Sequence, residues 1–577
     1  MEKGPYNTGG EIRGVVASPG IAIGRAHVLR KRDAVSTGIL LKDESEVLRA
    51  IEKFELAVQA SVEEVKSLKR QRGLSNEEVD ILETHIEFLT DPQIKADVFR
   101  EITKNKKNVI DSVIDVIHKT VDMFRNMDDD YLRTRAADIQ DIGDRILKNL
   151  LHTGNNEQTF PPNTILLAED ISPSDAIAFD MSRIIGFATR VGGKTSHTAI
   201  LAKSKNIPAV VGCGTALDII ETEDVVIVDG TTGIVIVNPD EIRLEEYKAR
   251  KEACDAEHKF LSSLKDIPAI TPDGVAITLL ANIANADDMD DALTYRAAGA
   301  GLFRTELLFM NRTAFPTEDE QLEFYKKTAL KAKGKPVTVR TIDIGGDKPL
   351  DYFTFPKEDN PFLGYRAIRI SLDRQDIFIT QLRAILRASV FGTLKIMFPM
   401  ISSLQELRQA KEILERAKAQ LSDEGIEFDK TIPVGMMIEV PSAAVMADLL
   451  AKEVDFFSIG TNDLCQYTLA VDRGNEKVKA LYDPFNPAVL RLIGYVIEQA
   501  HKQKIGVSLC GELASDPQAT LVLMGMGLRE FSMSAASIPA IKNVIIHNAF
   551  SKATEICENV MAMDNSKTII DYLQTQK

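Results

Sequence analysis

His197 stands in a run of small and hydroxyl-bearing residues that could support covalent chemistry. The run reads Gly192-Gly193-Lys194-Thr195-Ser196-His197-Thr198-Ala199-Ile200. The glycines predict a turn and the residues after them a short apolar helix, whose unpaired N–H groups favour a bound anion. The same groups disfavour a charged imidazolium, so the ring stays neutral and nucleophilic. The pattern indicates a histidine that accepts a phosphoryl group, or one that merely caps a helix.

Four arginines lie at or just beyond short apolar runs in the C-terminal half of the chain: Arg304, Arg340, Arg366 and Arg473. Guanidinium groups bind phosphate and carboxylate oxygens in forked pairs. Several arginines that converge would therefore hold a compact polyanion, such as a small phosphorylated acid. For any one of them taken alone, a surface salt bridge is the alternative.

Two carboxylates follow apolar runs in the same half: Glu439 after Met437-Ile438, and Asp463 after Gly460-Thr461-Asn462. An apolar strand rarely delivers a carboxylate that lacks a partner. Near a phosphate, the two would form an open oxygen site suited to Mg²⁺ or Mn²⁺, with water and substrate completing the shell. The alternative is that they only neutralise the arginines.

Cys510 ends another apolar run, in Leu509-Cys510-Gly511. A buried, inert cysteine is the ordinary interpretation. Beside a cation and a phosphorylated acid, however, the thiol could donate a proton to an enolate. Lys348, in Gly345-Gly346-Asp347-Lys348, could add a positive charge at the same place.

The elements that must position these groups are short apolar runs alternating with helical patterns. The runs are Ile277 to Ile283, Gly301 to Phe303, Val337 to Val339, Leu394 to Phe398, Val434 to Ile438, Phe456 to Ile459, Gly506 to Leu509, and Leu528 to Phe531. Eight strands in roughly 300 residues predict a (β/α)8 barrel, whose active sites gather at the strand ends. Those ends carry Asn282, Arg304, Arg340, Met400, Glu439, Asn462 with Asp463, Cys510 and Ser532.

The N-terminal half predicts a small α/β domain interrupted by helices. Strand-like runs occur before Leu29 and again after Leu150, whereas the residues between them have helical periodicity. The first strands have no other sheet to join, so we expect the helical stretch to be an insertion. Its helix from Glu77 to Leu89 carries a second apolar stripe around His85, which indicates either a partner-binding face or a helix packed on two sides. The charged stretch from Pro239 to Lys265 predicts a helical connector.

Composition narrows the class of protein. The chain has 577 residues and a net charge of −16, which argues against nucleic-acid binding and suits a basic protein partner. Its five cysteines are scattered without a CxxC pair, which indicates reduced thiols. The sequence shows neither a membrane span nor a secretory signal, so we expect a cytoplasmic protein without direct membrane insertion.

Together these residues resemble enzyme I, the phosphoenolpyruvate-protein phosphotransferase of the bacterial sugar phosphotransferase system, over nearly the whole chain. The segments that carry the resemblance are Ala17 to Gly20, Gly192 to Thr198, Gly301 to Met310, Asp343 to Lys348, Asn360 to Arg369, Phe456 to Tyr467, Val471 to Asn475, and Cys510 to Ala514. The resemblance implies that residues 1–30 and 151–239 form a swivelling α/β phosphohistidine domain and residues 31–150 an all-helical carrier-binding domain. Residues 240–265 would be a linker, and 266–577 the phosphoenolpyruvate-binding (β/α)8 barrel and dimerisation domain.

The resemblance also implies a role for each candidate residue. Phosphoenolpyruvate would bind in the barrel with Mg²⁺, phosphorylate His197 and leave as pyruvate. The histidine phosphocarrier protein would dock on the helical insertion and take the phosphoryl group, and the enzyme would be a homodimer. Cys510 would protonate the enolate, Glu439 and Asp463 would bind the metal, and the substrate would be held by Arg304, Arg340, Asn462, Asp463 and Arg473, assisted by Arg366 and Lys348.

Two positions depart from the family pattern: Cys465 stands where threonine is common, and Lys194 replaces a common arginine. Neither change removes a catalytic group. An ATP-dependent dikinase of the pyruvate, phosphate dikinase kind resembles the chain in both motifs, but residues 1–150 offer no nucleotide-binding loop. A non-catalytic regulator with the same fold is the other alternative, and the intact His197, Glu439, Asp463 and Cys510 argue against it.

Overall fold

The chain divides into two structural units, Met1–His258 and Lys259–Lys577. The computed structural model describes residues 10–29, 36, 38–69, 76–125, 130–151, 160–171, 175, 179–193, 196–205, 207–310, 312–346, 350, 352–475 and 477–576. Within these ranges, no helix is both long enough and apolar enough to cross a membrane.

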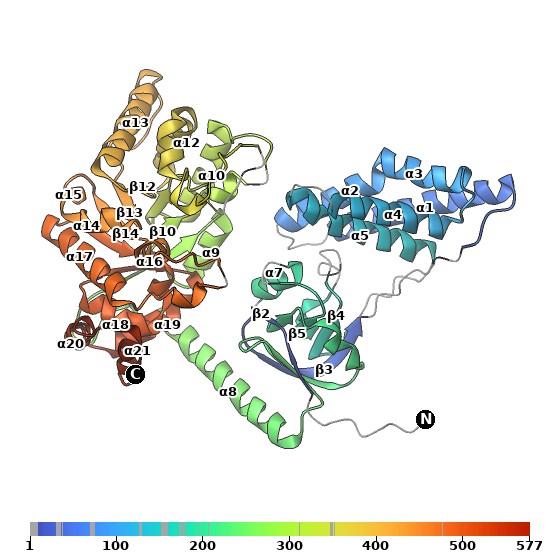
Figure 1. Ribbon diagram of the computed structural model, residues 1–577, viewed down its shortest axis with the longest axis horizontal. Coiled ribbons are helices and arrows are strands. Elements are labelled where there is room, and N and C mark those ends of the chain that lie inside the picture. Colours follow the sequence, from blue (N-terminus) through green and yellow to red (C-terminus); the bar gives the residue numbers. More distant parts are fainter. Residues whose placement is uncertain are drawn as a thin grey trace. The chain divides into compact units, whose positions relative to one another are not determined.

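An eight-stranded sheet forms the α/β part of the first unit (Figure 1), in the order β1-β8-β7-β3-β4-β5-β6-β2. The strands are β1 (Gly10–Arg13), β2 (Val15–Ser18), β3 (Ile21–Leu29), β4 (Thr164–Ala168), β5 (Ile184–Thr189), β6 (Ala209–Val211), β7 (Val225–Asp229) and β8 (Ile234–Val237). Strand β3 pairs in parallel with β4, although the helical stretch separates the two in sequence. The helical stretch is therefore an insertion into the α/β domain, as the sequence predicts.

Five helices make up the insertion: α1 (Glu44–Lys69), α2 (Asn76–Thr90), α3 (Pro92–Thr103), α4 (Val109–Arg125) and α5 (Asp130–Leu150). Their apolar stripes meet in a core that includes Phe54, Leu82, Val113 and Ile139. Helix α5 packs against α1, α2 and α4. Burial of one stripe on each helix accounts for the bundle, because helices gain most of their stability from such packing.

The second stripe of α2 is not a free surface at His85. The imidazole is 1% exposed, and its Nδ1 and Nε2 lie 3.7 Å from carboxylate oxygens of Asp141 and Asp138 on α5. Phe88 makes an edge-on contact with Phe124 of α4, with ring centroids 6.4 Å apart. The partner-binding interpretation of this stripe is therefore wrong at His85, which the same bundle covers, whereas Phe88 is only partly buried.

A closed barrel of eight parallel strands forms the second unit. The strands are β9 (Thr278–Ile283), β10 (Ala300–Phe303), β11 (Val337–Arg340), β12 (Leu394–Phe398), β13 (Val434–Ile438), β14 (Phe456–Ile459), β15 (Gly506–Leu509) and β16 (Glu530–Met533). Each strand falls on a predicted run, although β16 begins two residues later than the apolar run. Leu528 is buried but precedes the ladder, because pairing with β9 starts at Glu530.

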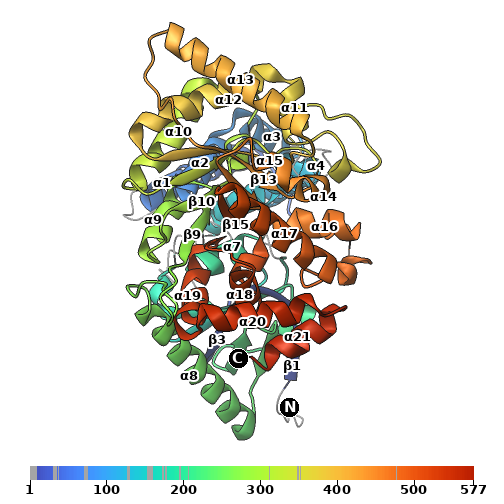
Figure 2. The same cartoon turned by 90° about the vertical axis from the view of Figure 1, so that its left-hand side faces the viewer.

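Helices follow the barrel strands and cover the barrel from outside (Figure 1). They are α9 (Ala286–Thr294), α10 (Glu318–Lys331), α11 (Ile368–Asp373), α12 (Gln375–Ala388), α13 (Leu404–Asp423), α14 (Pro441–Val445), α15 (Ala447–Leu450), α16 (Thr461–Leu469), α17 (Pro487–Gln503), α18 (Pro517–Gly525), α19 (Ile538–His547), α20 (Phe550–Met561) and α21 (Ser566–Gln574). The last two pack against α18 near the C-terminus (Figure 2). The fold is thus an α/β domain with a helical insertion, followed by a TIM-type barrel.

Among the α-helices of the described residues, α7 (His197–Ser204) and α8 (Glu241–Ser263) belong to neither group. Helix α7 packs against β2 and β6 of the sheet in the first unit. Helix α8 occupies the charged stretch, which confirms that this stretch is helical.

Candidate active site

The barrel topology brings the predicted polar groups to one rim. Arg340 is the last residue of β11, Glu439 follows β13, and Cys510 follows β15. Asp463 lies in the first turn of α16, four residues after the end of β14. Because all eight strands are parallel, their carboxyl ends open on the same side of the barrel, where TIM-barrel enzymes build their sites.

A chain of ion pairs crosses this rim. Asp343 accepts from Arg340 Nη2 at 3.1 Å through Oδ2 and from Arg366 Nη2 at 2.9 Å through Oδ1. Arg366 Nη2 also lies 3.5 Å from Asp463 Oδ2, and Arg473 Nη2 lies 3.4 Å from Asp463 Oδ1. Three of the four predicted arginines therefore meet through two carboxylates.

Arg340 and Arg366 are buried cations, not surface salt bridges. They are 6% and 2% exposed. Burial alone would lower the pKa of each, but it is outweighed by carboxylates, chiefly Glu306 for Arg340 and Asp343 for Arg366, so both pKa values lie above the usual range. In each guanidinium the buried Nε hydrogen-bonds to no atom of the described residues. A buried donor without a partner is costly, which suits a site that an oxygen-rich ligand completes.

Glu439 is a strongly perturbed carboxyl group. It is 2% exposed, and its Oε1 accepts a hydrogen bond of 2.6 Å from the backbone N–H of Met400. Burial and the negative charges of Asp463 and Asp343 raise its pKa to about 8. The protonated form therefore dominates near neutral pH unless a cation relieves the repulsion.

A divalent cation fits the donors that this rim offers. Asp463 Oδ1 is buried and accepts no hydrogen bond from the described residues, and Glu439 lies near enough for the charge of Asp463 to raise its pKa. Both are the hard oxygen ligands that Mg²⁺ prefers. No group of three or more potential metal-binding side chains occurs within the described ranges. Water and substrate would therefore have to complete a coordination shell, as in an open catalytic site.

Cys510 is a buried thiol at the same rim. Its Sγ donates to the carbonyl oxygen of Ile459 at 3.7 Å. Burial raises the pKa of the thiol, although a hydrogen bond with Ser458 and the positive charges of Arg340 and Arg304 oppose the rise. The thiol therefore carries its proton at neutral pH, as a proton donor must. The influence of Arg304 on the thiol also places that guanidinium within electrostatic range.

The end of β15 is tied to the neighbouring strands β16 and β9 of the barrel. Asn282 Nδ2 donates to the carbonyl oxygen of Cys510 at 3.0 Å, and Ser532 Oγ donates to Asn282 Oδ1 at 2.7 Å. A Cβ on Gly511 would lie 1.9 Å from Thr461 Oγ1, so only glycine permits this approach to α16. These contacts fix the backbone that carries the thiol.

The remaining predicted side chains take different places. Arg304 is exposed just beyond β10, and its N–H donates to the carbonyl oxygen of Ile283. Asn462 Oδ1 accepts a hydrogen bond of 2.9 Å from the backbone N–H of Glu512. This bond holds the side-chain amide of Asn462 at the rim. Lys348 lies outside the described residues.

Three residues without a predicted role complete the network. Glu306 pairs with Arg340, and Asp343 bridges Arg340 and Arg366. Tyr467 accepts from Arg366 Nη1 at 3.0 Å and donates to a backbone carbonyl. Asp343 follows Arg340 by three residues, a spacing that could have suggested an ion pair. The contact of Tyr467 with Arg366 joins positions 101 residues apart and has no sequence signal.

The predicted phosphohistidine turn leads into α7, which begins at His197. Ser196 caps the helix by accepting from the N–H of Ala199 at 3.3 Å. Thr198 is buried, donates to Asp170 Oδ1 at 2.8 Å and accepts from the N–H of Ile171 at 3.2 Å. The predicted helix start is confirmed, whereas the His197 side chain and all of Lys194 lie outside the described parts of the chain.

Cys465 is distinct from Cys510 in its surroundings. It is fully buried on α16, and burial raises the pKa of its thiol to about 11, with contacts from Asp483 and Tyr482. Such a thiol is protonated and unreactive at neutral pH.

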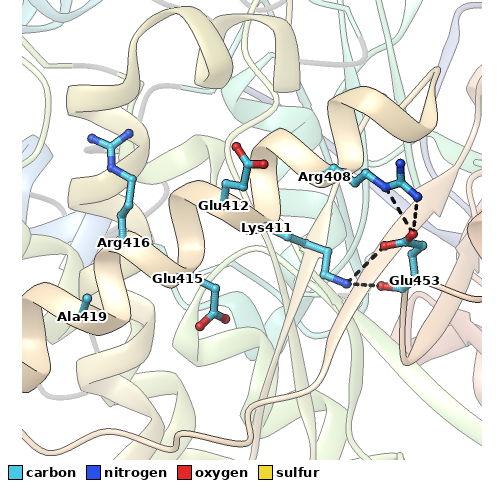
Figure 3. Close-up of a pocket in the computed structure, with 7 residues that line it drawn as sticks. All are labelled: Arg408, Lys411, Glu412, Glu415, Arg416, Ala419 and Glu453. Atoms are coloured by element: carbon cyan, nitrogen blue, oxygen red, sulfur yellow. Dashed lines mark hydrogen bonds and ion pairs between the residues drawn. The ribbon is translucent and has the colours of Figure 1, made fainter.

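A groove along α13 is unrelated to these residues (Figure 3). Its cationic side chains are occupied: Arg408 Nη2 donates to Glu453 Oε1 at 2.8 Å, and Lys411 Nζ donates to the carbonyl oxygen of Glu453. None of the predicted site residues lines it. Ionic pairing on an exposed helix accounts for the charged side chains that line it.

Three family matches cover most of the chain. Residues 13–135 match the N-terminal domain of the PEP-utilising enzymes, residues 160–233 their mobile domain, and residues 258–550 their PEP-binding domain. The barrel, its rim of arginines and carboxylates, and the separate helix α7 thus define a PEP-utilising enzyme.

Curated relatives narrow the class. A protein of Bacillus sp. (strain S) is 45% identical over 567 residues, 98% of this chain and 97% of the relative. A protein of Geobacillus stearothermophilus is 44% identical, with 98% of this chain and 97% of the relative covered, and one of Haemophilus influenzae is 44% identical, with 98% of each covered. All three are named phosphoenolpyruvate-protein phosphotransferase. This chain belongs to that family.

Proposed function

We propose that the enzyme transfers the phosphoryl group of phosphoenolpyruvate to His197, releases pyruvate, and passes the group to a histidine of the histidine phosphocarrier protein. This is the first step of the sugar phosphotransferase system. The observation that carries the proposal is the buried Arg340–Asp343–Arg366 network beside the protonated thiol of Cys510. It combines a site for a small anion with a proton donor for the product.

The arginines at the rim and the amide of Asn462 bind the substrate. Arg304, Arg340 and Arg473 neutralise the phosphate and carboxylate of phosphoenolpyruvate, and Asn462 contributes its amide. Arg366 holds Asp343 and Asp463 in place, and Lys348 adds a positive charge. Glu439 and Asp463 would hold Mg²⁺, or Mn²⁺, which supplies neutralisation of charge on the transferred group when it is bound.

The bond changes balance with water as the only further reactant. The bond between phosphorus and the enol oxygen breaks while a ring nitrogen of His197 bonds to phosphorus. The electron pair left on the enolate takes the proton of the Cys510 thiol at carbon, which yields pyruvate. Arg340 and Arg304 stabilise the thiolate, which regains a proton from water. Because the transition state of phosphoryl transfer is loose, positioning and charge neutralisation provide most of the catalysis.

His197 must meet both phosphoenolpyruvate and a separate carrier protein, and one rigid arrangement cannot serve the two encounters. We therefore assign residues 1–30 and 151–239 to a swivelling phosphohistidine domain and 266–577 to the substrate-binding domain. The charged helix within residues 240–265 is the linker. Domain closure and reopening of this kind is a common way to sequester a reacting group.

The partners follow from the same assignment. The carrier docks on residues 31–150, and the net charge of −16 favours a basic carrier. The barrel provides the homodimer contact, and the enzyme acts in the cytoplasm.

Pyruvate release tests the function. Wild-type protein, phosphoenolpyruvate, Mg²⁺ and purified carrier should give pyruvate continuously, whereas omission of the carrier should limit pyruvate to one equivalent of enzyme. ATP in place of phosphoenolpyruvate should not phosphorylate the protein. Phosphorylation by ATP alone would favour the dikinase, and no pyruvate with any donor would favour a non-catalytic regulator.

A further inference from the structure

Gln381 is a fully buried amide in the middle of α12, between the two strand ends that carry Arg304 and Arg340. Its Oε1 accepts a hydrogen bond of 2.9 Å from the N–H of Ile342, two residues beyond the end of β11. Its Nε2 donates to Thr305 Oγ1 at 3.3 Å, two residues beyond the end of β10. The side chain of Gln381 thus hydrogen-bonds to the segment after β10 and to the segment after β11.

The orientation of this amide is fixed by its partners. A backbone N–H can only donate, so the oxygen of Gln381 must face Ile342 and the nitrogen must face the two hydroxyl groups. The second hydrogen of Nε2 goes to Tyr325, whose hydroxyl lies at 3.1 Å. Both donors and the acceptor of the buried Gln381 amide are therefore used.

The network continues from Thr305 to the arginine strand. Thr305 Oγ1 donates to the carbonyl oxygen of Arg340 at 3.0 Å, and Thr305 is itself fully buried. Thr305 is also the direct neighbour of Arg304 in sequence. The backbone of Arg340 and the residue that follows Arg304 are consequently tied to one point on α12.

We propose that Gln381 is a positioning residue that sets the spacing of Arg304 and Arg340 for their shared ligand. The role rests on the function proposed above. A forked guanidinium holds oxygens well only within a narrow range of geometry, and a displacement of about 1 Å can cost about 100-fold in rate. Gln381 itself contacts no substrate, so it acts through the two strand ends.

Gln321 on α10 offers a matched control. It is also a buried glutamine, its Oε1 accepts from the same Tyr325 hydroxyl at 3.2 Å, and its Nε2 donates to the carbonyl oxygen of Pro316 at 3.1 Å. Its hydrogen bonds reach neither Thr305 nor Ile342. Replacement of either glutamine by methionine keeps the side-chain length and removes a buried amide, so both variants should show a similar decrease in Tm.

Steady-state kinetics on the full-length variants separates positioning from mere stability. Gln381→Met should lower kcat/KM for phosphoenolpyruvate by at least about tenfold, mainly through a higher KM, whereas Gln321→Met should stay within about twofold of wild type. Equal kinetic loss in the two variants would overturn the proposal. Because the wild type is assayed alongside, absence of activity in wild type would instead refute the proposed function.

Two further measurements support the test: hydrogen exchange does not depend on activity, and variants of Thr305 do not depend on the folding of the Gln381 variant. Amide hydrogen exchange at Ile342 should accelerate in Gln381→Met but not in Gln321→Met, and unchanged exchange would contradict the geometry. Thr305→Val removes the hydroxyl that links Gln381 to Arg340, and Thr305→Ser keeps it. The valine variant should lose kcat/KM like Gln381→Met and the serine variant should recover it; a valine variant as active as the serine variant would overturn the role.

Discussion

Arg366 donates to the carboxylate of Asp343 at 2.9 Å, and both side chains are almost completely buried. The same carboxylate receives Arg340, so one anion separates two cations at the mouth of the barrel. Like charges held close in a dry site are costly unless an anion lies between them. Arg340 also pairs with Glu306, and Arg366 lies 3.5 Å from Asp463, so Asp343 is the carboxylate that the two cations share.

Removal of that carboxylate should harm both stability and binding. Asp343→Ala leaves two buried cations short of a partner, so we expect about 3 kcal/mol lower stability and about tenfold higher KM for phosphoenolpyruvate. Asp376→Asn is the control, because Asp376 pairs with Arg374 at the exposed start of α12 and should cost about 0–1 kcal/mol. Denaturant unfolding and pyruvate assays measure the two effects; similar results for both variants would contradict a structural role of Asp343.

Loss of the Cys510 thiol should slow the product step. Cys510→Ala should reduce pyruvate formation by about 100-fold or more while it changes phosphoenolpyruvate binding much less. Cys557→Ala is the control, since Cys557 is a buried thiol on α20 whose pKa burial raises to about 11. Equal pyruvate rates in Cys510→Ala and wild type would rule out the proton donor.

The pH dependence of the same step follows from the raised pKa of Cys510. The donor must hold its proton, so the protonated fraction is complete at neutral pH and falls only as pH rises through the thiol pKa in the alkaline range. Pyruvate formation at saturating substrate should accordingly decline on the alkaline side. A rate that still rises there would contradict donation from this thiol.

Mg²⁺ should stabilise the protein more at high pH than at low pH. The pKa of Glu439 is raised from 4.5 to about 8, so its contribution to stability is complete below the lower value and is lost as pH rises through the higher one. The cation needs the ionised carboxylate, and it must displace a proton at low pH. The increase in Tm caused by Mg²⁺ should therefore grow as pH rises toward about 8 and level off above it.

A neutral replacement checks that interpretation. Glu439→Gln keeps an oxygen that can accept from Met400 N–H but cannot ionise. In this variant the Tm increase from Mg²⁺ should be small and independent of pH. A response equal to that of wild type would show that another group binds the cation.

His197→Ala should separate the two sites. The variant should bind phosphoenolpyruvate nearly as well as wild type, because the rim residues belong to the barrel, yet it should form no phosphoenzyme. Titration calorimetry and phosphate analysis measure the two properties. Loss of binding together with phosphorylation would contradict the division of roles.

The sequence predicts the barrel and most of the rim because both depend on local patterns. Apolar runs end at Arg340, Glu439 and Cys510, and strand ends of a parallel barrel must meet. Such patterns do not reveal that Arg366 is buried, since it lies on a loop and arginine is usually exposed. Its burial depends on Asp343, a contact that only the folded loops create.

The error at His85 has a related cause. A second apolar stripe predicts that this face of the helix is buried, but it does not show whether another protein or the same bundle buries it. Here the cover is partly α5, whose Asp138 and Asp141 flank the imidazole. The predicted start of β16 differs from the observed start for a simpler reason. Leu528 is buried, but strand pairing with β9 begins only at Glu530.

Transfer of a phosphoryl group from phosphoenolpyruvate to His197 is the central claim, and the intact mass of the protein tests it most directly. After mixing with phosphoenolpyruvate and Mg²⁺, the mass should increase by one acid-labile phosphoryl group. The increase should disappear on addition of excess pyruvate or of the carrier, and it should be absent in His197→Ala. An unchanged mass of the wild-type protein, or an increase that persists in His197→Ala, would contradict the account.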